Sequence, residues 1–303
     1  MYHNPVMLDE CMEGLNIRPD GVYVDLTFGG GGHSKRILEL LNEKGRLIAF
    51  DQDADAQQNI PDDPRFLLVD ENFRYMINFL RFHQAFPVDG ILADLGISSH
   101  HIDEPERGFA TRFNGPLDMR MNRKQELTAA QVLNTYPEEK LKMIFATYGE
   151  ITNARQLASV IIQSRSKELT TVDEFRALIG SLVPRKIENK YLAQVFQAIR
   201  IEVNDEIGAL SAMLRQTPHC LKKGGRLVVI SYHSLEDRLV KNFIRAGNTE
   251  GQIEKDFYGN SRTPLEAVSR KAITPTESEL ESNPRSRSAK LRKAEKTEDG
   301  NNA

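Results

Sequence analysis

A run of four glycines at positions 29–32, directly after a stretch of β-forming residues, constrains the fold of this chain more than any other feature. Val22, Val24 and Leu26 alternate in the manner of a strand, and residues 34–41 take up the apolar spacing of a helix. The segment is therefore predicted to be a strand, a glycine turn and a helix. Glycine permits positive φ and close backbone approach, and the amides that open a helix carry the positive end of its dipole. We expect a small ligand with an anionic or carboxylate group over this turn.

The composition is that of a globular protein. The chain has 303 residues, of which 40% are hydrophobic, enough for one large domain or two ordinary ones. Its two cysteines, Cys11 and Cys220, offer neither a disulfide framework nor a metal-binding pair, which favours a reducing compartment. The chain has no signal-peptide pattern and no run of about eighteen apolar residues, so we expect a cytoplasmic protein with no membrane partner.

Strand and helix patterns alternate through the first third of the chain. Further strand patterns follow the glycine turn at residues 45–51, 65–69 and 89–96, with a helix expected to begin at residue 53. Such alternation predicts a parallel sheet with right-handed crossovers, and ligands of these sheets bind at the carboxyl ends of the strands. Asp25, Asp51 and Asp94 all fall at that edge. The predicted binding site therefore joins these acids to the glycine turn.

From about residue 105 the pattern changes to one helix after another. Thr128, Thr135 and Thr171 each stand three residues before a glutamine or glutamate, the spacing of a helix-capping box. Apolar residues from Leu192 to Leu214 then predict one long amphipathic stripe. We therefore expect a helical domain here.

The α/β pattern resumes with a strand at residues 224–231 and a helix that has Ser234 as its predicted N-cap. The chain therefore interrupts one sheet with a helical block of ordinary domain size. The expected parts are an α/β domain of residues 1–104 and 206–293, an inserted helical domain for substrate recognition of residues 105–205, and a disordered polar tail of residues 294–303.

The residues around the turn favour S-adenosylmethionine over a dinucleotide. A nicotinamide-binding fingerprint would need a third glycine where the chain has Ser34. Asp25, just before the glycines, would repel a pyrophosphate but attract an ammonium or a sulfonium. Asp51 suits ribose hydroxyls in either kind of site, while Phe73 and Asp94 can hold an adenine ring and its amine. Each residue alone is equally compatible with a helix-capping acid or a core aromatic, but together at one edge they favour a cofactor site.

Eight motifs in this order resemble those of the bacterial ribosomal RNA small subunit methyltransferase H family. They lie at residues 3–10, 25–34, 94–99, 107–109, 114–121, 197–204, 231–238 and 283–288. Members of that family methylate N4 of a cytidine in the decoding region of 16S rRNA, with S-adenosylmethionine as the cofactor. The resemblance extends from residue 3 to about residue 292. It implies a Rossmann-like S-adenosylmethionine-dependent methyltransferase sheet with an inserted all-helical domain.

The resemblance also implies a set of cofactor contacts, to which the strand pattern adds Asp25. The implied contacts fall on Gly31, Gly32, His33, Asp51, Phe73 and Asp94. One further family contact is usually a glutamine and corresponds here to His101. A histidine offers a single hydrogen bond where an amide offers a pair, so this contact departs from the family pattern.

Methyl transfer to N4 requires the nitrogen to be aligned behind the sulfonium methyl group and water to be excluded. The N4 lone pair is delocalised into the ring, so an acceptor must hold the N4 hydrogens and turn the lone pair outward. We assign this catalytic role to Asp94 and Ser98, with Ser99 and the carbonyls of residues 95–98 as alternatives. Carbon methylation would need a cysteine nucleophile, and neither cysteine falls at a strand end.

Two other chemistries are disfavoured by spacing. His233, Ser234 and Asp237 suggest a hydrolase triad, but consecutive residues of these types are more typical of a helix start. The adjacent His100 and His101 lack a third ligand at metal-site spacing, so no metal is expected.

Cationic clusters are the predicted rRNA contacts, since the net charge of -3 argues against bulk phosphate binding. They comprise Arg107, Arg112, Arg120, Arg123, Arg200 with Asn204, Arg285, Arg287, Lys290, Arg292 and Lys293. The expected partner is 16S rRNA within the 30S subunit, and a homodimer is left open. Two alternatives remain: a methyltransferase for a small molecule or protein, and a nucleotide-binding assembly factor without chemistry.

Overall fold

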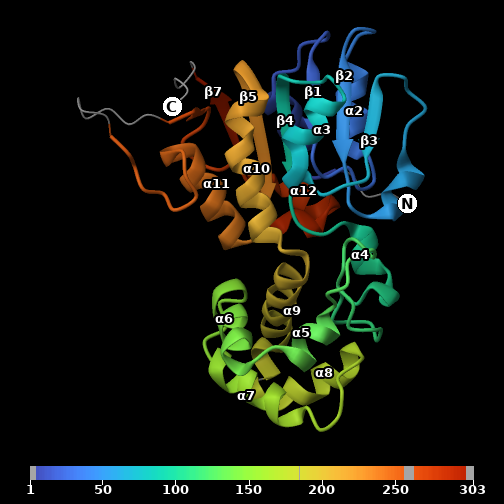
Figure 1. The fold of residues 1–303 in the computed structure, drawn as a ribbon, viewed down its shortest axis with the longest axis vertical. Helices are drawn as coiled ribbons and strands as arrows, with labels where there is room; N and C mark the ends of the chain where they lie inside the picture. Colours follow the sequence, from blue (N-terminus) through green and yellow to red (C-terminus); the bar gives the residue numbers. More distant parts are fainter. Residues whose placement is uncertain (1–4, 184, 256–262, 298–303) are drawn as a thin grey trace. The chain divides into compact units, whose positions relative to one another are not determined.

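The computed structural model describes residues 5–183, 185–255 and 263–297. The chain divides into two compact units, one formed by Met1–Gly96 with Ile207–Ala303 and the other by Ile97–Glu206. The first unit contains the sheet and the second is helical (Figure 1). From the sequence we expect the helical domain at residues 105–205, whereas the second unit begins at Ile97 and ends at Glu206.

The first unit is built on a seven-stranded sheet of order β3-β2-β1-β4-β5-β7-β6. Its strands are β1 (Val22–Asp25), β2 (Arg46–Phe50), β3 (Phe66–Val69), β4 (Val88–Asp94), β5 (Leu221–Ser231), β6 (Leu265–Ala267) and β7 (Lys290–Lys296). Strands β1 to β5 pair in parallel, and β7 is antiparallel to both β5 and β6. The predicted Rossmann-like sheet is confirmed. Its order reverses between β1 and β4, the place where ligands of such sheets bind.

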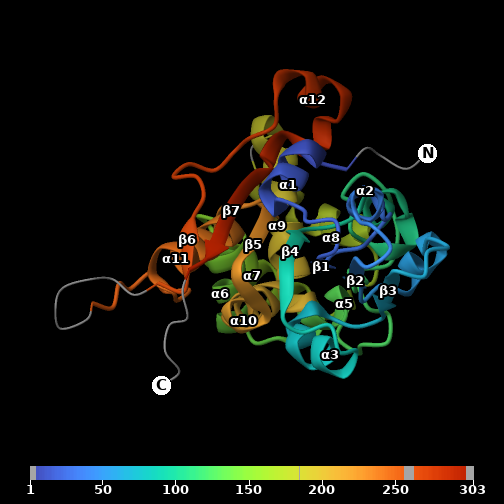
Figure 2. The same cartoon turned by 90° about the horizontal axis from the view of Figure 1, so that it is seen from above.

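Helices cover both faces of this sheet, which explains why its strands read as nearly continuous apolar runs. They are α1 (Leu8–Leu15), α2 (Gly32–Leu40), α3 (Met76–Phe82), α10 (Glu206–Cys220), α11 (Ser234–Ala246), α12 (Glu277–Ser282) and the short 3-10 helices η1 (Ala54–Asn59), η2 (Phe73–Tyr75) and η6 (Pro284–Ser288). Tyr23 packs with α1 and α2, whereas its neighbour Val24 packs with α3, α10 and α11 on the opposite face (Figure 2).

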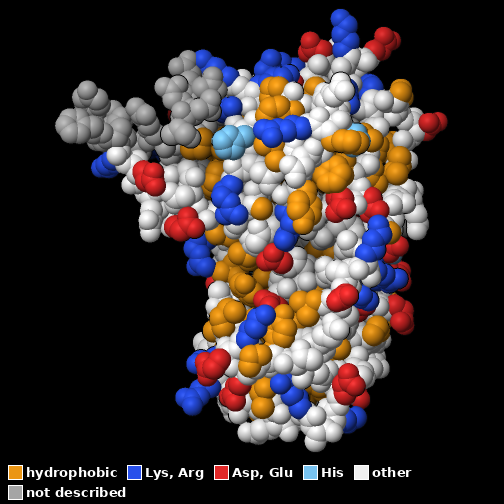
Figure 3. All heavy atoms as spheres, viewed as in Figure 1, with side chains coloured by type: hydrophobic (Ala, Val, Ile, Leu, Met, Phe, Trp, Pro, Cys, Tyr) orange, Lys and Arg blue, Asp and Glu red, His pale blue; other side chains and the backbone are white. Residues whose placement is uncertain are grey.

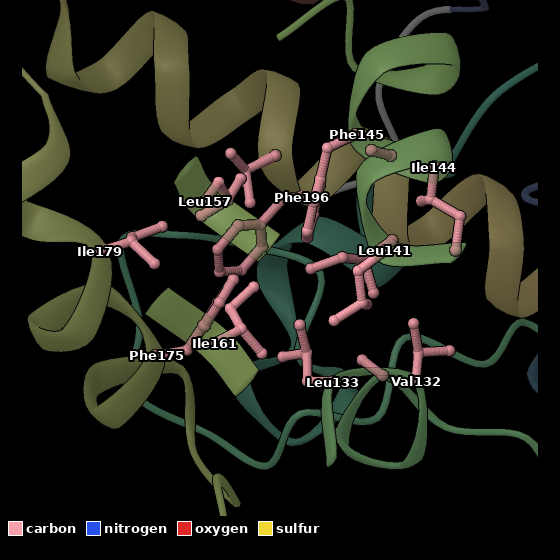
Figure 4. Packing of buried hydrophobic residues seen from close by; sticks show 14 of the residues in the cluster. Val132, Leu133, Leu141, Ile144, Phe145, Leu157, Ile161, Phe175, Ile179 and Phe196 are labelled. Atoms are coloured by element: carbon pink, nitrogen blue, oxygen red, sulfur yellow. The ribbon is translucent and has the colours of Figure 1, made fainter. Parts of the chain in front are cut away.

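The helical unit contains its own apolar core. Its helices are α4 (Ser99–Asp103), α5 (Ala129–Thr135), α6 (Glu138–Tyr148), α7 (Ala154–Ser164), α8 (Val172–Ile179), α9 (Glu188–Asn204) and the 3-10 helices η3 (Pro105–Arg107), η4 (Gly180–Leu182) and η5 (Arg185–Ile187). The rings of Phe175 and Phe196 lie 6.0 Å apart in this core, among aliphatic side chains from α5, α6 and α7 (Figure 4). A core of this kind lets the unit bury apolar surface without the sheet.

Several predicted helix boundaries need correction. The capping boxes at Thr128 and Thr171 are present, but the one at Thr135 is wrong. Thr135 is the last residue of α5, its hydroxyl donates to the Gln131 carbonyl at 2.7 Å, and Pro137 precedes α6. The long stripe is also divided, because Asp205 adopts a left-handed φ of 45° between α9 and α10.

Three smaller predictions also differ from the structure. The helix after residue 53 is the short 3-10 helix η1, which ends at Asn59. Pro61 disfavours helical backbone at the residue before it, Ile60. His233, not Ser234, is the N-cap of α11, and its Nδ1 accepts from the Glu236 amide at 3.4 Å. Residues 294–296, predicted to be disordered, complete β7, while residues 298–303 lie outside the described residues.

Across the described segments, none of the helices combines the length and apolar character needed to span a membrane.

Candidate active site

The predicted strand, glycine turn and helix are β1, residues 26–31 and α2. Gly29 and Gly31 adopt positive φ of 50° and 77°, and Gly31 is the N-cap of α2. A Cβ on Gly31 would approach the Phe28 ring to 3.0 Å, and one on Gly32 would approach Pro5 to the same distance. The turn therefore requires glycine both for its backbone angles and for its close packing.

Asp25 stabilises this turn through two hydrogen bonds that its carboxylate accepts. Its side chain is 1% exposed, Oδ2 accepts from the Ser34 hydroxyl at 2.7 Å, and Oδ1 accepts from the Thr27 amide at 3.1 Å. Burial raises the pKa of its carboxyl, and the nearby His33 opposes that rise. The contacts present tie β1 to the first turn of α2. The predicted direct contact with the cofactor stays a prediction.

Asp51 joins the end of β2 to the same turn. Its Oδ2 accepts from the Gly29 amide at 2.7 Å and its Oδ1 accepts from the Asp53 amide at 2.9 Å. Burial raises the pKa of Asp51 to about 6, although both hydrogen bonds favour the charged form. Each carboxylate oxygen has a second lone pair, so the half-buried side chain can still accept from hydroxyl groups. Phe73, in η2, is half-buried and packs against the apolar core that also contains Phe50 of β2.

Asp94 ends β4, the strand beside β1. Its amide donates to the Thr27 hydroxyl at 2.7 Å, and its Oδ1 accepts from the Tyr232 hydroxyl at 2.7 Å. The carboxylate is 22% exposed, and its Oδ2 lies 3.9 Å from Nδ1 of His33. Burial raises the pKa of Asp94 to about 6, while His33 and Tyr232 act in the opposite direction.

The glycine turn, Asp25, Asp51 and Asp94 are joined by the hydrogen bonds described above, through Ser34, Thr27 and the Gly29 amide. Bare glycine backbone, two partly accessible carboxylates and a half-buried aromatic ring are the kinds of group that the predicted cofactor contacts require. The individual contacts stay predictions. Sequence reasoning missed Tyr232. The available signal was its place directly after β5, the strand adjacent to β4.

Ser98 and His101 belong to the helical unit. Ser98 is the N-cap of α4, where its hydroxyl oxygen accepts from the His101 amide at 3.2 Å. The His101 ring is 6% exposed and stacks on Phe109 with ring centroids 4.8 Å apart. Their predicted catalytic and cofactor roles stay predictions.

The arginines after β4 differ in their availability to a phosphate. Arg107 is 1% exposed and donates to the carbonyls of Arg120 and Met121 at 3.0 Å, so its predicted phosphate contact is wrong. Arg120 forms a paired contact with Asp118, whereas Arg123 is exposed. Arg112 is also largely exposed and lies 2.7 Å from the carboxylate of Asp103.

The helix α9 does not present its polar residues as predicted. Arg200 forms two hydrogen bonds with Glu206, at 2.8 and 2.9 Å. The Asn204 amide group donates to the Met119 carbonyl and accepts from the Met121 amide. Both side chains therefore stabilise the helical unit itself.

Some of the cations near the C-terminus are held in ion pairs, and others are exposed. Arg292 bonds the Asp237 carboxylate at 2.7 Å, and Lys293, 8% exposed, bonds Glu13 at 2.6 Å. Arg287 and Lys290 are exposed. Cationic side chains on the face shown in Figure 3 are interspersed with acidic ones rather than gathered into one patch. Exposed positions are thus the better candidates for contacts with RNA.

Comparison with known proteins identifies the family. The model of the MraW methylase family matches residues 1–297. "Ribosomal RNA small subunit methyltransferase H" of Parabacteroides distasonis is 58% identical over 297 residues, covering 97% of each chain. The protein of the same name from Bacteroides thetaiotaomicron is 58% identical over 296 residues, again covering 97% of each chain. The predicted resemblance is confirmed, and the chain belongs to the MraW methylase family.

Proposed function

We propose that this methyltransferase, whose cofactor is S-adenosylmethionine, methylates N4 of a cytidine in the decoding region of 16S rRNA. The names of its relatives support ribosomal RNA of the small subunit as the substrate class. The observation that carries the choice of a nitrogen is the partly exposed Asp94 carboxylate at the end of β4, beside the glycine turn. An rRNA substrate also supports a cytoplasmic location.

The cofactor supplies a methyl group on a positively charged sulfur. The glycine turn would leave room for it, Asp51 would accept hydrogen bonds from its ribose hydroxyls, and Phe73 would pack against its adenine ring. Asp94 would contribute negative charge that favours the sulfonium. These roles use only groups that the structure leaves partly accessible at the carboxyl edge of the sheet.

Asp94 also serves the acceptor nitrogen. Its carboxylate accepts an N4 hydrogen, which orients the lone pair toward the methyl group. Transfer of the methyl group from the sulfur of the cofactor would leave N4 with one proton to lose. A carboxylate with a pKa of about 6 can take that proton at neutral pH. We propose the Ser98 hydroxyl as a second acceptor for the amine.

The cysteines support methylation at nitrogen rather than carbon. Cys11 lies in α1 and Cys220 ends α10, and both are fully buried. Burial raises the pKa of the Cys11 thiol well above its ordinary value and that of Cys220 to about 12. Neither thiol can act as the nucleophile that methylation at C5 requires.

The test is transfer of a labelled methyl group from S-adenosylmethionine to 30S subunits from a strain that lacks this protein. Nucleoside digestion and mass spectrometry should find the label in N4-methylated cytidine, in 30S subunits more than in naked 16S rRNA. Label in another nucleoside would contradict the proposal. Label in a protein or small molecule would support the second enzyme hypothesis, and binding without transfer would support an assembly factor.

A further inference from the structure

We infer that Tyr232 is a positioning residue for methyl transfer, whose hydroxyl fixes the Asp94 carboxylate so that Oδ2 faces the acceptor amine. This inference rests on the proposed function, because it assigns an atom to the amine-binding role of Asp94.

A hydrogen bond to a residue of the next helix fixes the backbone of Tyr232. It follows Ser231, the last residue of β5, and its amide donates to Oε2 of Glu236 at 2.9 Å. Glu236 is the third residue of α11 and, with His233, forms the capping box of that helix. A helix start therefore determines where the tyrosine leaves the strand.

The turn after β4 fixes the ring of Tyr232. Gly96 has a φ of 104°, and a Cβ there would lie 3.2 Å from Cδ2 of the ring. Glycine thus lets the chain pass directly against the aromatic face. From this position the hydroxyl donates to Oδ1 of Asp94 at 2.7 Å, a distance typical of a strong bond to a carboxylate.

The second carboxylate oxygen has a different environment. Nε2 of His33 lies 3.0 Å from the Val6 carbonyl, which can only accept, so we place the ring proton on Nε2. The lone pair of Nδ1 then faces Oδ2 of Asp94 at 3.9 Å, too far for a hydrogen bond. Oδ1 already accepts from Tyr232. Oδ2 accepts no hydrogen bond in the contacts described above and is therefore the better acceptor for an N4 hydrogen.

Charged and titratable groups surround Asp94 on every packed element. The Tyr232 hydroxyl and, when its ring is protonated, His33 on α2 favour the carboxylate, whereas Asp25 on β1 and Glu236 on α11 disfavour it. The charge of Asp94 in turn raises the pKa of the Cys11 thiol on α1. Removing the hydroxyl deletes one of the two favourable interactions and raises the pKa of Asp94 further.

The experiment measures single-turnover methyl transfer to 30S subunits between pH 5.5 and 9 for the wild-type chain and Tyr232→Phe. The variant should lose roughly threefold in rate at pH 6.5 through the altered ionisation of Asp94, and this part of the loss should disappear at pH 8.5. The acidic limb of the profile should move upward by about one pH unit. A rate and a pH profile equal to those of the wild type would overturn the inference.

A double-mutant cycle separates action through Asp94 from a general structural effect. In an Asp94→Asn background, adding Tyr232→Phe should leave the remaining rate unchanged within about twofold. A loss as large as in the wild-type background would show that Tyr232 does not act through Asp94. Tyr23→Phe is the matched control, since Tyr23 is also buried in this unit and its hydroxyl accepts from the Arg18 amide at 2.7 Å. It should keep the wild-type pH profile.

Mass spectrometry of the labelled nucleoside distinguishes the two proposals. If the wild-type product is not N4-methylated cytidine, the proposed function fails whatever the cycle shows. If that product forms but the cycle is additive, only the role of Tyr232 fails. Thermal unfolding of each variant confirms that the rates compare folded proteins.

Discussion

At the scale of single residues, the site is dominated by carboxylates that the fold buries and then supports with donated hydrogen bonds. Asp25, Asp51 and Asp94 all have raised pKa values because burial outweighs those bonds. Their positions at strand ends were predictable from the alternation of strands and acids. The protection of Asp25 was not, because its partner Ser34 lies in the next helix and a pattern does not show which way a side chain turns.

Asp51→Ala should weaken S-adenosylmethionine binding by about 1–3 kcal/mol, the range for a lost hydrogen bond to a charged or buried group. Isothermal titration calorimetry measures this directly. Asp62→Ala is the control, since Asp62 is an exposed acid in the same connection between β2 and β3. Equal affinity of the Asp51 variant and the wild type would remove Asp51 from the cofactor site.

Asp94→Asn should stabilise the cofactor-free protein at pH 8 but not at pH 4. The pKa of Asp94 is about 6 in the fold against an ordinary 3.8, so ionisation lowers the stability as pH rises between these values. Above that window the loss is at most about 3 kcal/mol, because one pKa unit corresponds to about 1.4 kcal/mol. Melting temperatures of both proteins at the two pH values test this. A variant equally stabilised at pH 4 would contradict the electrostatic explanation.

At the scale of elements, short-range rules predicted what short-range contacts determine. The capping boxes of α5 and α8 follow from three-residue spacings and are present. The same spacing failed at Thr135, because Pro137 takes the N-cap position of α6. The break after Asn204 was missed because the apolar stripe continues through it, although Asp205 adopts a left-handed conformation there.

Thr171→Ala should destabilise the protein by about 1 kcal/mol, whereas Thr135→Ala should change its stability by only a few tenths. Thr171 accepts from the Glu174 amide at the start of α8, but the hydroxyl of Thr135 only donates to a carbonyl that is already helical. Urea unfolding of both variants gives the comparison. Equal midpoints would show that the capping box adds nothing measurable.

At the scale of the whole molecule, the fold class was predictable because the sheet repeats one local pattern. The positions of the cations were not, since residue type does not reveal burial. Arg107 and Lys293 were predicted to contact RNA, yet they are buried against carbonyls and a carboxylate respectively. Lys293 and Glu13 pair although they lie near opposite ends of the chain. No local sequence pattern in either segment predicts such a long-range contact.

The exposed cations near the C-terminus give the corresponding prediction. Arg287→Ala with Lys290→Ala should weaken binding to 16S rRNA and reduce the slope of log affinity against log salt by up to about 2, since each phosphate contact contributes roughly 0.7–0.9. Filter binding between 50 and 300 mM salt measures the slope. Lys44→Ala with Lys241→Ala removes the same charge from other exposed positions and should leave it unchanged. Arg292→Ala should instead lower the stability, because it leaves Asp237 without its closest partner. An unchanged slope for the first pair would mean that these cations face solvent in the complex and that the rRNA contacts lie elsewhere.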